Sequence, residues 1–197
     1  MLRIGLTGGI AAGKSVVSER LGELGAHIVD HDVLSRRVVE PGSAALIEIV
    51  RAFGDRVMTD GKLDRQALGS LVFADNRARA RLNGIVHPYI EAMATAIDRR
   101  SRAAGETVVV HDIPLLVETH QGGSFGLVVT VAAPEDLRLK RLMETRSMRH
   151  DAAQARIDSQ ASDADRAAVA DYVLDGSGTR DQLRRQVDEF WRIHVPQ

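Results

Sequence analysis

The chain contains one short segment whose residue types and spacing fit phosphate chemistry. Residues 8–15 read Gly-Gly-Ile-Ala-Ala-Gly-Lys-Ser, which matches the pattern G-x-x-x-x-G-K-[ST]. In such loops the backbone wraps around an anion and points its N–H groups at the α- and β-phosphates. Lys14 would reach the β- and γ-phosphates, and the Ser15 hydroxyl would bind Mg²⁺. The residues predicted to bind a nucleoside triphosphate are Gly8, Gly9, Ile10, Ala11, Ala12, Gly13, Lys14, Ser15 and Val16.

Two acidic residues, Asp30 and Asp32, follow the apolar run His27-Ile28-Val29. If that run is a parallel strand, both acids lie at its carboxyl end, where open α/β sheets bind ligands. Because side chains alternate along a strand, these two share a face where the strand geometry continues. Such carboxylates could coordinate Mg²⁺ or accept a proton from a hydroxyl. The alternative is that they begin a loop and cap the next helix, as aspartate often does.

Strands and helices that alternate along the chain must position these residues. Short runs rich in Val, Ile and Leu indicate strands at 2–7, 27–29, 107–111, 127–131 and 172–174. Nearly continuous apolar strands separated by helices indicate a parallel sheet that is buried on both faces. We therefore predict an α/β protein with a three-layer P-loop NTPase fold and a five-stranded parallel sheet.

Several helices have recognisable starts. Val17 and Leu21 follow the phosphate loop at helical spacing, so the loop precedes a helix N-terminus, where the dipole favours phosphate. Pro134 opens another helix in the manner of a proline in the first turn. Thr179 with Gln182 three residues later resembles a capping box for the last helix.

A long and mostly helical block, residues 41–104, separates the second and third strands. Its predicted interruptions are the Asp60-Gly61 turn and His87-Pro88, because a residue before proline resists helical geometry. The block is too long for a simple crossover, so we expect a helical subdomain over one side of the sheet. The core of the single domain is expected at residues 1–40, 105–140 and 168–197.

Composition sets limits on the partners of the protein. The 197 residues are 44% hydrophobic and 27% charged, as in ordinary globular domains, and the formal net charge is −1. This charge gives no strong field for nucleic acid, so we expect no such partner. No apolar stretch approaches the roughly 20 residues of a membrane span, and because the first strand follows at once, we expect no signal peptide. The absence of cysteine excludes disulfides and thiolate metal sites, and fits the cytoplasm, where we expect the protein.

The whole chain resembles the bacterial dephospho-coenzyme A kinases. Besides the phosphate loop, the resemblance rests on residues 28–36 (IVDHDVLSR), 82–88 (LNGIVHP), 112–118 (DIPLLVE), 160–162 (QAS) and 175–178 (DGSG). It implies transfer of the γ-phosphate of ATP, with Mg²⁺, to the ribose 3′-hydroxyl of dephospho-coenzyme A, the last step of coenzyme A synthesis. The main partner is then this small molecule, and we expect a monomer or a weak homo-oligomer.

The resemblance implies roles for individual residues. Asp32 matches the second acid of the family and would be the catalytic base, with Asp30 as a support or as a metal ligand beside Ser15. On the acceptor side it implies contacts from Asp32, His87, Pro88, Leu115 and Glu118. On the nucleotide side it implies contacts from Arg166, Gly176, Ser177 and Gly178. Packing is the alternative for His87 and Leu115, and Asp112 either lies near the Mg²⁺ shell or makes a local turn.

A cluster of basic residues comprises Arg138, Lys140, Arg141, Arg146 and Arg149. Such a cluster is usually a solvated face, and arginine is the default cation here, because only three of the 26 basic residues are lysines. The resemblance instead implies a small helical lid at residues 141–167, whose arginines close over ATP. The second arginine position of the family is Thr145 here, so its role falls to Arg146 or Arg149. We expect the catalytic residues to be Lys14, Asp32, Arg141 and Arg146.

Two other functions compete with this interpretation. A P-loop kinase for another small acceptor, such as a nucleoside monophosphate or a sugar acid, would share the phosphate loop but would not need residues 114–118. A GTPase switch would need an Asn-Lys-x-Asp motif, and the only asparagines are Asn76 and Asn83. The phosphate loop also has Ala11-Ala12 where the family commonly has a glycine and a small residue, a change small enough for binding to survive.

Overall fold

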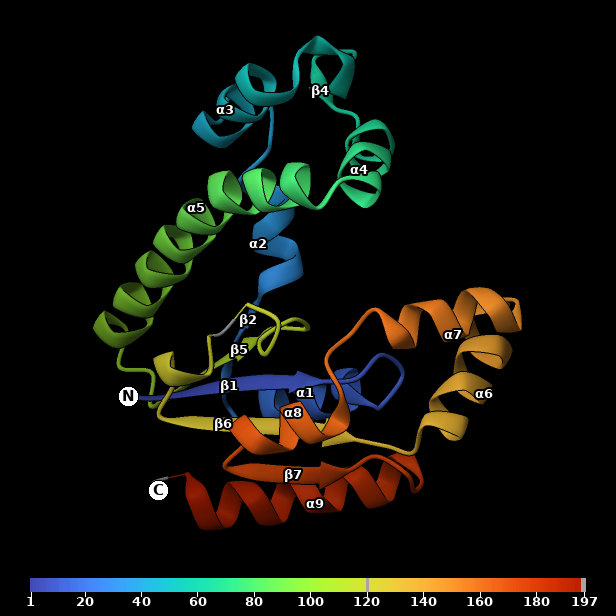
Figure 1. Cartoon of the computed structure of the whole chain (residues 1–197). Helices are drawn as coiled ribbons and strands as arrows, with labels where there is room; N and C mark the ends of the chain where they lie inside the picture. Colours follow the sequence, from blue (N-terminus) through green and yellow to red (C-terminus); the bar gives the residue numbers. More distant parts are fainter. Residues whose placement is uncertain (120, 196–197) are drawn as a thin grey trace. The chain divides into compact units, whose positions relative to one another are not determined.

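The computed structural model of the chain describes residues 1–119 and 121–195 (Figure 1). The chain divides into two compact units. The first is Met1–Asp30 with Ser101–Gln197, and the second is His31–Arg100. Each unit has its own apolar core. No helix in the described ranges is long and apolar enough to cross a membrane.

A five-stranded parallel sheet forms the centre of the first unit. Its strands are β1 (Leu2–Gly8), β2 (His27–Asp30), β5 (Val108–Asp112), β6 (Leu127–Ala132) and β7 (Tyr172–Asp175). Their order is β2-β5-β1-β6-β7, and every pairing is parallel. The predicted parallel sheet is confirmed, and each strand bound lies within one residue of its expected position.

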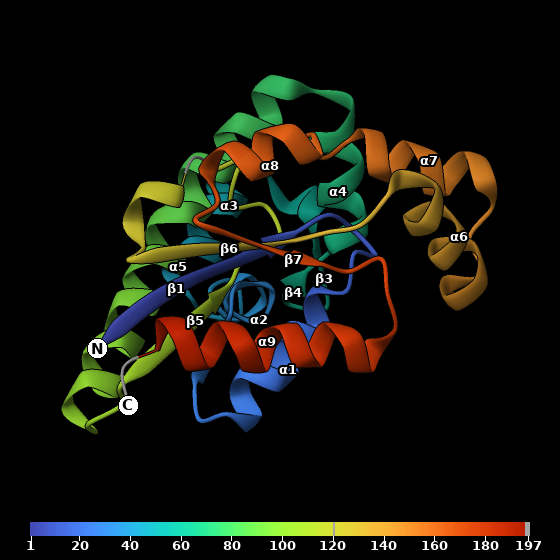
Figure 2. The same ribbon diagram turned by 90° about the horizontal axis from the view of Figure 1, so that it is seen from below.

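Helices cover both faces of this sheet, so the first unit has three layers. α1 (Lys14–Glu23) and α9 (Arg180–His194) pack together on one face, and α8 (Asp163–Val169) lies on the other (Figure 2). The predicted capping box of Thr179 and Gln182 is present at the start of α9. The buried strand residues that pack with α1 and α9 come from alternate positions and are Ile4, Leu6, Val108, Val110, Val129 and Val131.

Two further helices, α6 (Glu135–Arg146) and α7 (His150–Asp158), form a hairpin after β6. Pro134 precedes the first residue of α6 as its N-cap, close to the predicted start. The buried residues of the hairpin are Leu142, Ala153 and Ile157. Ile10 and Ala11 of the phosphate loop pack against this small cluster. The hairpin is therefore attached to the loop by apolar contacts.

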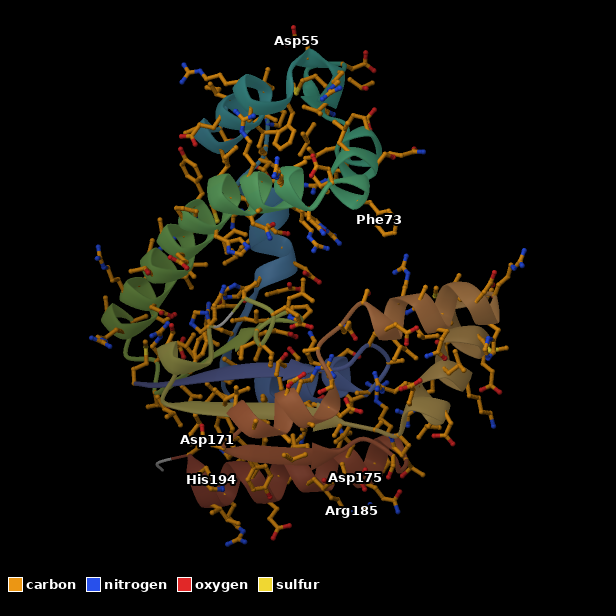
Figure 3. The ribbon with its side chains drawn as sticks, viewed as in Figure 1. Asp55, Phe73, Asp171, Asp175, Arg185 and His194 are labelled. Carbon is orange, nitrogen blue, oxygen red and sulfur yellow. The ribbon has the colours of Figure 1, made fainter. Side chains whose placement is uncertain are left out.

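The second unit is mainly helical and contains α2 (His31–Arg37), α3 (Ala44–Phe53), α4 (Arg65–Ala74) and most of α5 (Asn76–Ala103). The predicted Asp60-Gly61 turn joins β3 (Met58–Thr59) to β4 (Lys62–Leu63), two short antiparallel strands that were not predicted. The core residues of the second unit are Val38, Val39, Ala45, Ile49, Phe53, Val57 and Leu68. Phe73 of α4 is instead 94% exposed, and Figure 3 shows it pointing outward.

The predicted interruption of the helical block at His87-Pro88 was wrong, because α5 runs through Pro88. A proline costs a helix one hydrogen bond and clashes with the preceding turn. Apolar residues on both sides of Pro88 pack against the core of the second unit: Leu82, Ile85, Val86, Tyr89 and Ile90. Packing of this continuous apolar face outweighs the local cost of the proline.

The condition under which Asp30 and Asp32 would share a strand face is not met. β2 ends at Asp30 and α2 begins at His31, so Asp32 lies in the first turn of a helix. Pairing of β2 with β5 stops at Asp30, and nothing extends the strand further. The Ser35 hydroxyl donates to the Asp32 carbonyl at 2.8 Å, a contact between residues three apart in a helix.

Candidate active site

The phosphate loop lies between the end of β1 and the start of α1. Gly13 precedes α1 with φ +114°, and its carbonyl accepts a hydrogen bond from Val16 N–H at 2.9 Å. Lys14 and Ser15 are the first two residues of the helix. The N–H groups of a first helical turn have no helical acceptors and stand at the positive end of the helix dipole. The loop therefore has the geometry of an anion-binding helix N-terminus.

Lys14 forms an ion pair with Asp112, from Nζ to Oδ1. Asp112 is the last residue of β5, and the sheet register places it level with Leu6 of β1 and Asp30 of β2. The side chains of Lys14 and Asp112 are 20% and 10% exposed. The carboxyl edge of the sheet therefore carries one cation and two carboxylates, and Ser15 follows Lys14 on α1.

The Ser15 hydroxyl on α1 and the carboxylates of Asp30 and Asp112 at the sheet edge are hard oxygen donors, the kind that fits Mg²⁺. Within residues 1–119 and 121–195, no group of three or more His, Cys, Asp or Glu residues could hold a metal ion by itself. Mg²⁺ is usually held by one or two carboxylates together with substrate phosphates and water, and the donors present suit that mode.

A cavity of about 370 Å³ opens beside the phosphate loop. Its lining comes from the loop, from α6 and from the segment after β7: Ala11, Gly13, Ser15, Val16, Arg141, Thr145, Arg146, Gly176, Gly178, Thr179, Arg180 and Leu183. Arg141 donates to the Ala11 carbonyl at 3.1 Å through Nη1 and to the Gly176 carbonyl at 2.8 Å through Nη2. Arg141 therefore joins the phosphate loop to the segment after β7.

The segment after β7 packs closely against the phosphate loop at Gly176. A Cβ atom there would lie 1.9 Å from the Ala12 carbonyl oxygen, so only glycine fits. Asp175, at the end of β7 (Figure 3), accepts a hydrogen bond from Ser177 N–H at 2.8 Å. Hydrogen bonding to Ser177 lowers the pKa of the Asp175 carboxyl. Of the predicted nucleotide-side residues, Gly176 and Gly178 therefore line the cavity, whereas Ser177 and Arg166 are not among its lining residues.

Two buried arginines lie beside Gly9 of the phosphate loop. Arg138 and Arg166 are only 3% and 2% exposed. Asp163 accepts hydrogen bonds from both, at 3.0 Å from Arg138 Nη2 and 2.9 Å from Arg166 Nη1. A Cβ atom on Gly9 would lie 2.8 Å from Arg138 Nη1 and 3.4 Å from Arg166 Nη1. Nε and Nη2 of Arg166 make no hydrogen bond to any described residue.

The solvated-face interpretation of the basic cluster was wrong for Arg138, whose Nε also donates to the Ala133 carbonyl at 3.0 Å. In a chain this rich in arginine, no sequence signal distinguishes Arg138 from its neighbours. Arg146 is exposed, although it lines the 370 Å³ cavity. Arg149 is 85% exposed and pairs with Asp151 at 3.3 Å.

The residues after β5 divide into core and surface. Leu116 is fully buried, whereas Leu115 is 48% exposed. Glu118 accepts a hydrogen bond from Ala161 N–H at 2.8 Å through Oε1. It also lies 4.0 Å from Arg166 Nη2. Glu118 therefore contacts the segment before α8.

The second unit contains a cavity of about 240 Å³. Most of its lining is apolar: Val39, Ile49, Leu63, Leu68, Leu82, Val86 and Ile90. Its polar lining residues are Ser35, Arg65, Asn83 and His87. Of the predicted acceptor-side residues in this unit, His87 therefore lines this cavity, whereas Asp32 and Pro88 are not among its lining residues.

The fold and the phosphate loop define a class, the P-loop NTPases. The parallel sheet, the loop after β1, the helix that begins at Lys14 and the acids at the carboxyl edge all belong to this architecture. A solved structure of a Thermus thermophilus protein agrees with this fold. Its TM-score is 0.84 and its sequence identity 30%, and the alignment covers 99% of this chain and 98% of that one.

Within that class, the chain belongs to the dephospho-CoA kinase family, whose model matches residues 2–182. The dephospho-CoA kinase of Leifsonia xyli subsp. xyli is 50% identical over 193 residues, which are 97% of this chain and 98% of that protein. A solved dephospho-CoA kinase from Campylobacter jejuni has a TM-score of 0.72 and 26% identity, with coverage of 96% and 95%. The chain spans about half, 48%, of the length of several mycobacterial relatives. Membership of this kinase family implies the use of ATP.

Proposed function

We propose that the protein transfers the γ-phosphate of ATP to the ribose 3′-hydroxyl of dephospho-coenzyme A, the last step of coenzyme A synthesis. The observation that carries this proposal is the phosphate loop with its Lys14–Asp112 ion pair, in a chain of this family. Phosphoryl transfer needs little covalent chemistry from the protein, so positioning and charge stabilisation dominate. Lys14 supplies a cation for the charge that develops on the phosphates.

ATP would place its phosphates in the loop of residues 8–16, on N–H groups at the start of α1 such as those of Lys14 and Ser15, and its nucleoside in the 370 Å³ cavity. The cavity combines apolar walls at Val16 and Leu183 with the carbonyl rim held by Arg141, which suits a base and a ribose. Ser15 and Asp30 would hold Mg²⁺, which neutralises charge on the β- and γ-phosphates when bound. Arg166 would lie on the phosphate side, next to Gly9.

Asp32 is the proposed base. Its carboxylate accepts the proton of the 3′-hydroxyl as the hydroxyl oxygen bonds to the γ-phosphorus, and ADP leaves with the bridging oxygen. Two observations support this role: Asp32 is exposed, and it follows the carboxyl end of β2 by two residues. Asp30 ends that strand and is the proposed support.

The acceptor has a long arm of methylene and amide groups, which needs an apolar surface with a few polar partners. The 240 Å³ cavity of the second unit has this character, so it would bind part of the arm, with His87 among its polar contacts. Pro88 would act by shaping α5. Leu115, which is half exposed, stays a predicted acceptor contact, whereas Glu118 is bonded to Ala161 N–H and its predicted acceptor contact is not part of this proposal.

The lid assignment likewise stays a prediction. Arg141 and Arg146 line the nucleotide cavity, and both remain the proposed catalytic arginines. A monomer or weak homo-oligomer in the cytoplasm, without a nucleic-acid partner, completes the proposal.

The test is ATP turnover by the purified protein with a panel of acceptors, scored by the mass of the acceptor product. We expect dephospho-coenzyme A to gain one phosphate, and AMP and a sugar acid such as gluconate to remain unmodified. Turnover with AMP or gluconate but not with dephospho-coenzyme A would contradict the proposal and favour the other kinase function. ATP hydrolysis without any phosphorylated acceptor would contradict it too.

A further inference from the structure

A short segment between α7 and α8 connects the phosphate loop to the residues that follow β5. Ile10 N–H donates to Gln160 Oε1 at 2.8 Å. The next residue, Ala161, donates its N–H to Glu118 Oε1, also at 2.8 Å. Glu118 lies six residues after Asp112, the partner of Lys14. We call residues 160–162 together with Glu118 the brace.

The brace bonds to the phosphate loop at Ile10, a residue that packing also holds in place. Ile10 is the third residue of the G-x-x-x-x-G-K-[ST] pattern. Its side chain packs against the buried cluster of α6 and α7, while its peptide N–H is bound by Gln160. A loop that must aim successive N–H groups at phosphates gains affinity when its peptides are already oriented.

The brace is itself firmly anchored on its carboxyl side. Ser162 is the N-cap of α8 and forms a capping box with Asp165. The next residue, Asp163, binds Arg138 and Arg166. Hydrogen bonding to Ser162 also lowers the pKa of the Asp165 carboxyl. Gln160 therefore projects from a backbone that is fixed on one side by α8 and on the other by α7.

We propose that Gln160 and Glu118 are positioning residues for ATP: Gln160 orients the Ile10 peptide of the phosphate loop, and Glu118 holds the backbone that carries Gln160. Neither side chain touches a substrate in this arrangement. The effect on turnover rests on the proposed function. The effect on ATP binding rests only on the phosphate loop and can be measured without an acceptor.

The chemistry of the Gln160 contact makes it testable by substitution. Its amide oxygen is the acceptor for a backbone donor, and the side chain is neutral. A glutamate at this position could accept the same bond, but its negative charge would stand beside the bound phosphates. Gln160→Glu should therefore weaken ATP binding even if the hydrogen bond survives, whereas a packing role would tolerate this isosteric change.

The first experiment measures the ATP dissociation constant by calorimetry for Gln160→Ala and Gln160→Glu, with Gln154→Ala as the matched control. Gln154 lies on α7 and bonds to Glu135 and Asp158 of the same hairpin, at 2.8 Å each. We expect Gln160→Ala to weaken ATP binding by about threefold to tenfold, the size of one net hydrogen bond, and Gln160→Glu by at least as much. Melting temperatures and the Gln154→Ala affinity should stay close to wild type. Unchanged ATP affinity in both Gln160 variants would overturn the proposal, as would an equal loss in Gln154→Ala.

The second experiment separates the two possible roles of Glu118. Glu118→Gln keeps an oxygen that can accept the Ala161 N–H, whereas Glu118→Ala removes it. We expect Glu118→Ala to weaken ATP binding and lower kcat, Glu118→Gln to restore most of both, and the KM for dephospho-coenzyme A to change by less than about twofold. A raised acceptor KM with normal ATP affinity would instead make Glu118 a substrate contact and overturn this part.

A double variant tests whether the two residues act through one link. Because Glu118 works by holding Gln160, its removal should matter little once Gln160 is gone. We expect Gln160→Ala/Glu118→Ala to bind ATP no more than about twofold more weakly than Gln160→Ala alone. Fully multiplicative losses would contradict the brace. If the protein does not phosphorylate dephospho-coenzyme A, the proposed function is refuted. The ATP affinities still test the positioning role of Gln160 and Glu118, because they are measured without an acceptor.

Discussion

Lys14 of the phosphate loop is paired with Asp112 at the end of β5, and so the first residue of α1 is tied to the neighbouring strand of the sheet. The register places Asp112 level with Asp30 on β2. A cation that must meet phosphates is therefore held in place by a carboxylate at the carboxyl edge of the sheet, where β2 also ends in Asp30. This pair organises the chemistry proposed above.

Removal of Lys14 tests whether this cation is needed for transfer. Without its ammonium group, charge on the γ-phosphate is poorly compensated in the transition state, so Lys14→Ala should lose about 10²-fold or more in kcat. Lys140→Ala is the control, because Lys140 is 67% exposed and pairs only loosely with Glu144, at 3.9 Å. Steady-state kinetics with thermal melts will separate chemistry from folding. A normal kcat in folded Lys14→Ala would refute the P-loop kinase mechanism.

Asp32 can be separated from Asp30 by amide substitutions. Asp32→Asn keeps the shape of the side chain but removes the proton acceptor, so kcat should fall by about 10²–10⁴-fold while ATP affinity changes little. Asp30→Asn should be milder, because Asp30 is the proposed support. The measurement is kcat together with ATP affinity for both variants. A large loss of kcat in Asp30→Asn, together with a small loss in Asp32→Asn, would reverse the two proposed roles.

The lid arginines are tested by three alanine variants. A cation that reaches the transferred phosphate can contribute about 10³–10⁵ in rate, so Arg141→Ala and Arg146→Ala should each lower kcat. Arg149→Ala should be neutral, because its side chain is 85% exposed. Arg→Lys at the sensitive position should rescue poorly, since a point charge does not reproduce the planar guanidinium. A large loss of kcat in Arg149→Ala, together with a normal kcat in Arg146→Ala, would assign the catalytic role to Arg149 instead of Arg146.

Ala11 carries backbone strain within the phosphate loop. Its φ is +61°, a left-handed conformation that costs a residue with a Cβ about 1–2 kcal/mol. Ala11→Gly relieves that cost and loses part of the gain to the greater freedom of glycine in the unfolded chain, so we expect a net stabilisation of about 0.5–1 kcal/mol. Ala12→Gly, at a buried position without positive φ, should be destabilising instead. Chemical denaturation of both variants is the measurement, and a less stable Ala11→Gly would contradict the strain argument.

The contact of α1 with α9 predicts a pH-dependent stability. Glu23 accepts hydrogen bonds from Arg184 and Arg20, which lower its pKa from 4.5 to about 2. Because the folded pKa is the lower one, Glu23 contributes fully above pH 4.5 and its contribution disappears as the pH falls toward 2. Glu23→Gln should therefore melt below wild type at neutral pH, and the two should converge in acid. Since these groups are solvent-exposed, salt should shrink the difference. A pH-independent difference would contradict this account.

The sequence predicts most of the sheet and of the phosphate loop, because both depend on local patterns. Continuous runs of Val and Ile indicate buried parallel strands, and the spacing of Gly, Lys and Ser in residues 8–15 indicates a phosphate loop. The path of α5 through Pro88 did not follow from local rules, because packing in the second unit decides it. The position of Asp32 in a helix depends on where β2 stops pairing with β5, and that pairing is not a local property of the sequence.

The contacts that join segments far apart in the chain could not be predicted from the sequence. Arg138 lies 25 residues from Asp163 along the chain, and Gln160 lies 150 residues from Ile10. An arginine on a solvated face and an arginine in a buried ion pair have the same local pattern. Only the fold distinguishes them, because it brings the phosphate loop, α6 and the start of α8 together.

The central claim is tested most directly by the position of the transferred phosphate. The purified protein is incubated with ATP labelled in its γ-phosphate, with Mg²⁺ and with either dephospho-coenzyme A or its 3′-deoxy analogue. We predict one labelled phosphate on the ribose 3′-oxygen of dephospho-coenzyme A, and none on the analogue. Label at another position, or equal labelling of the 3′-deoxy analogue, would contradict the account.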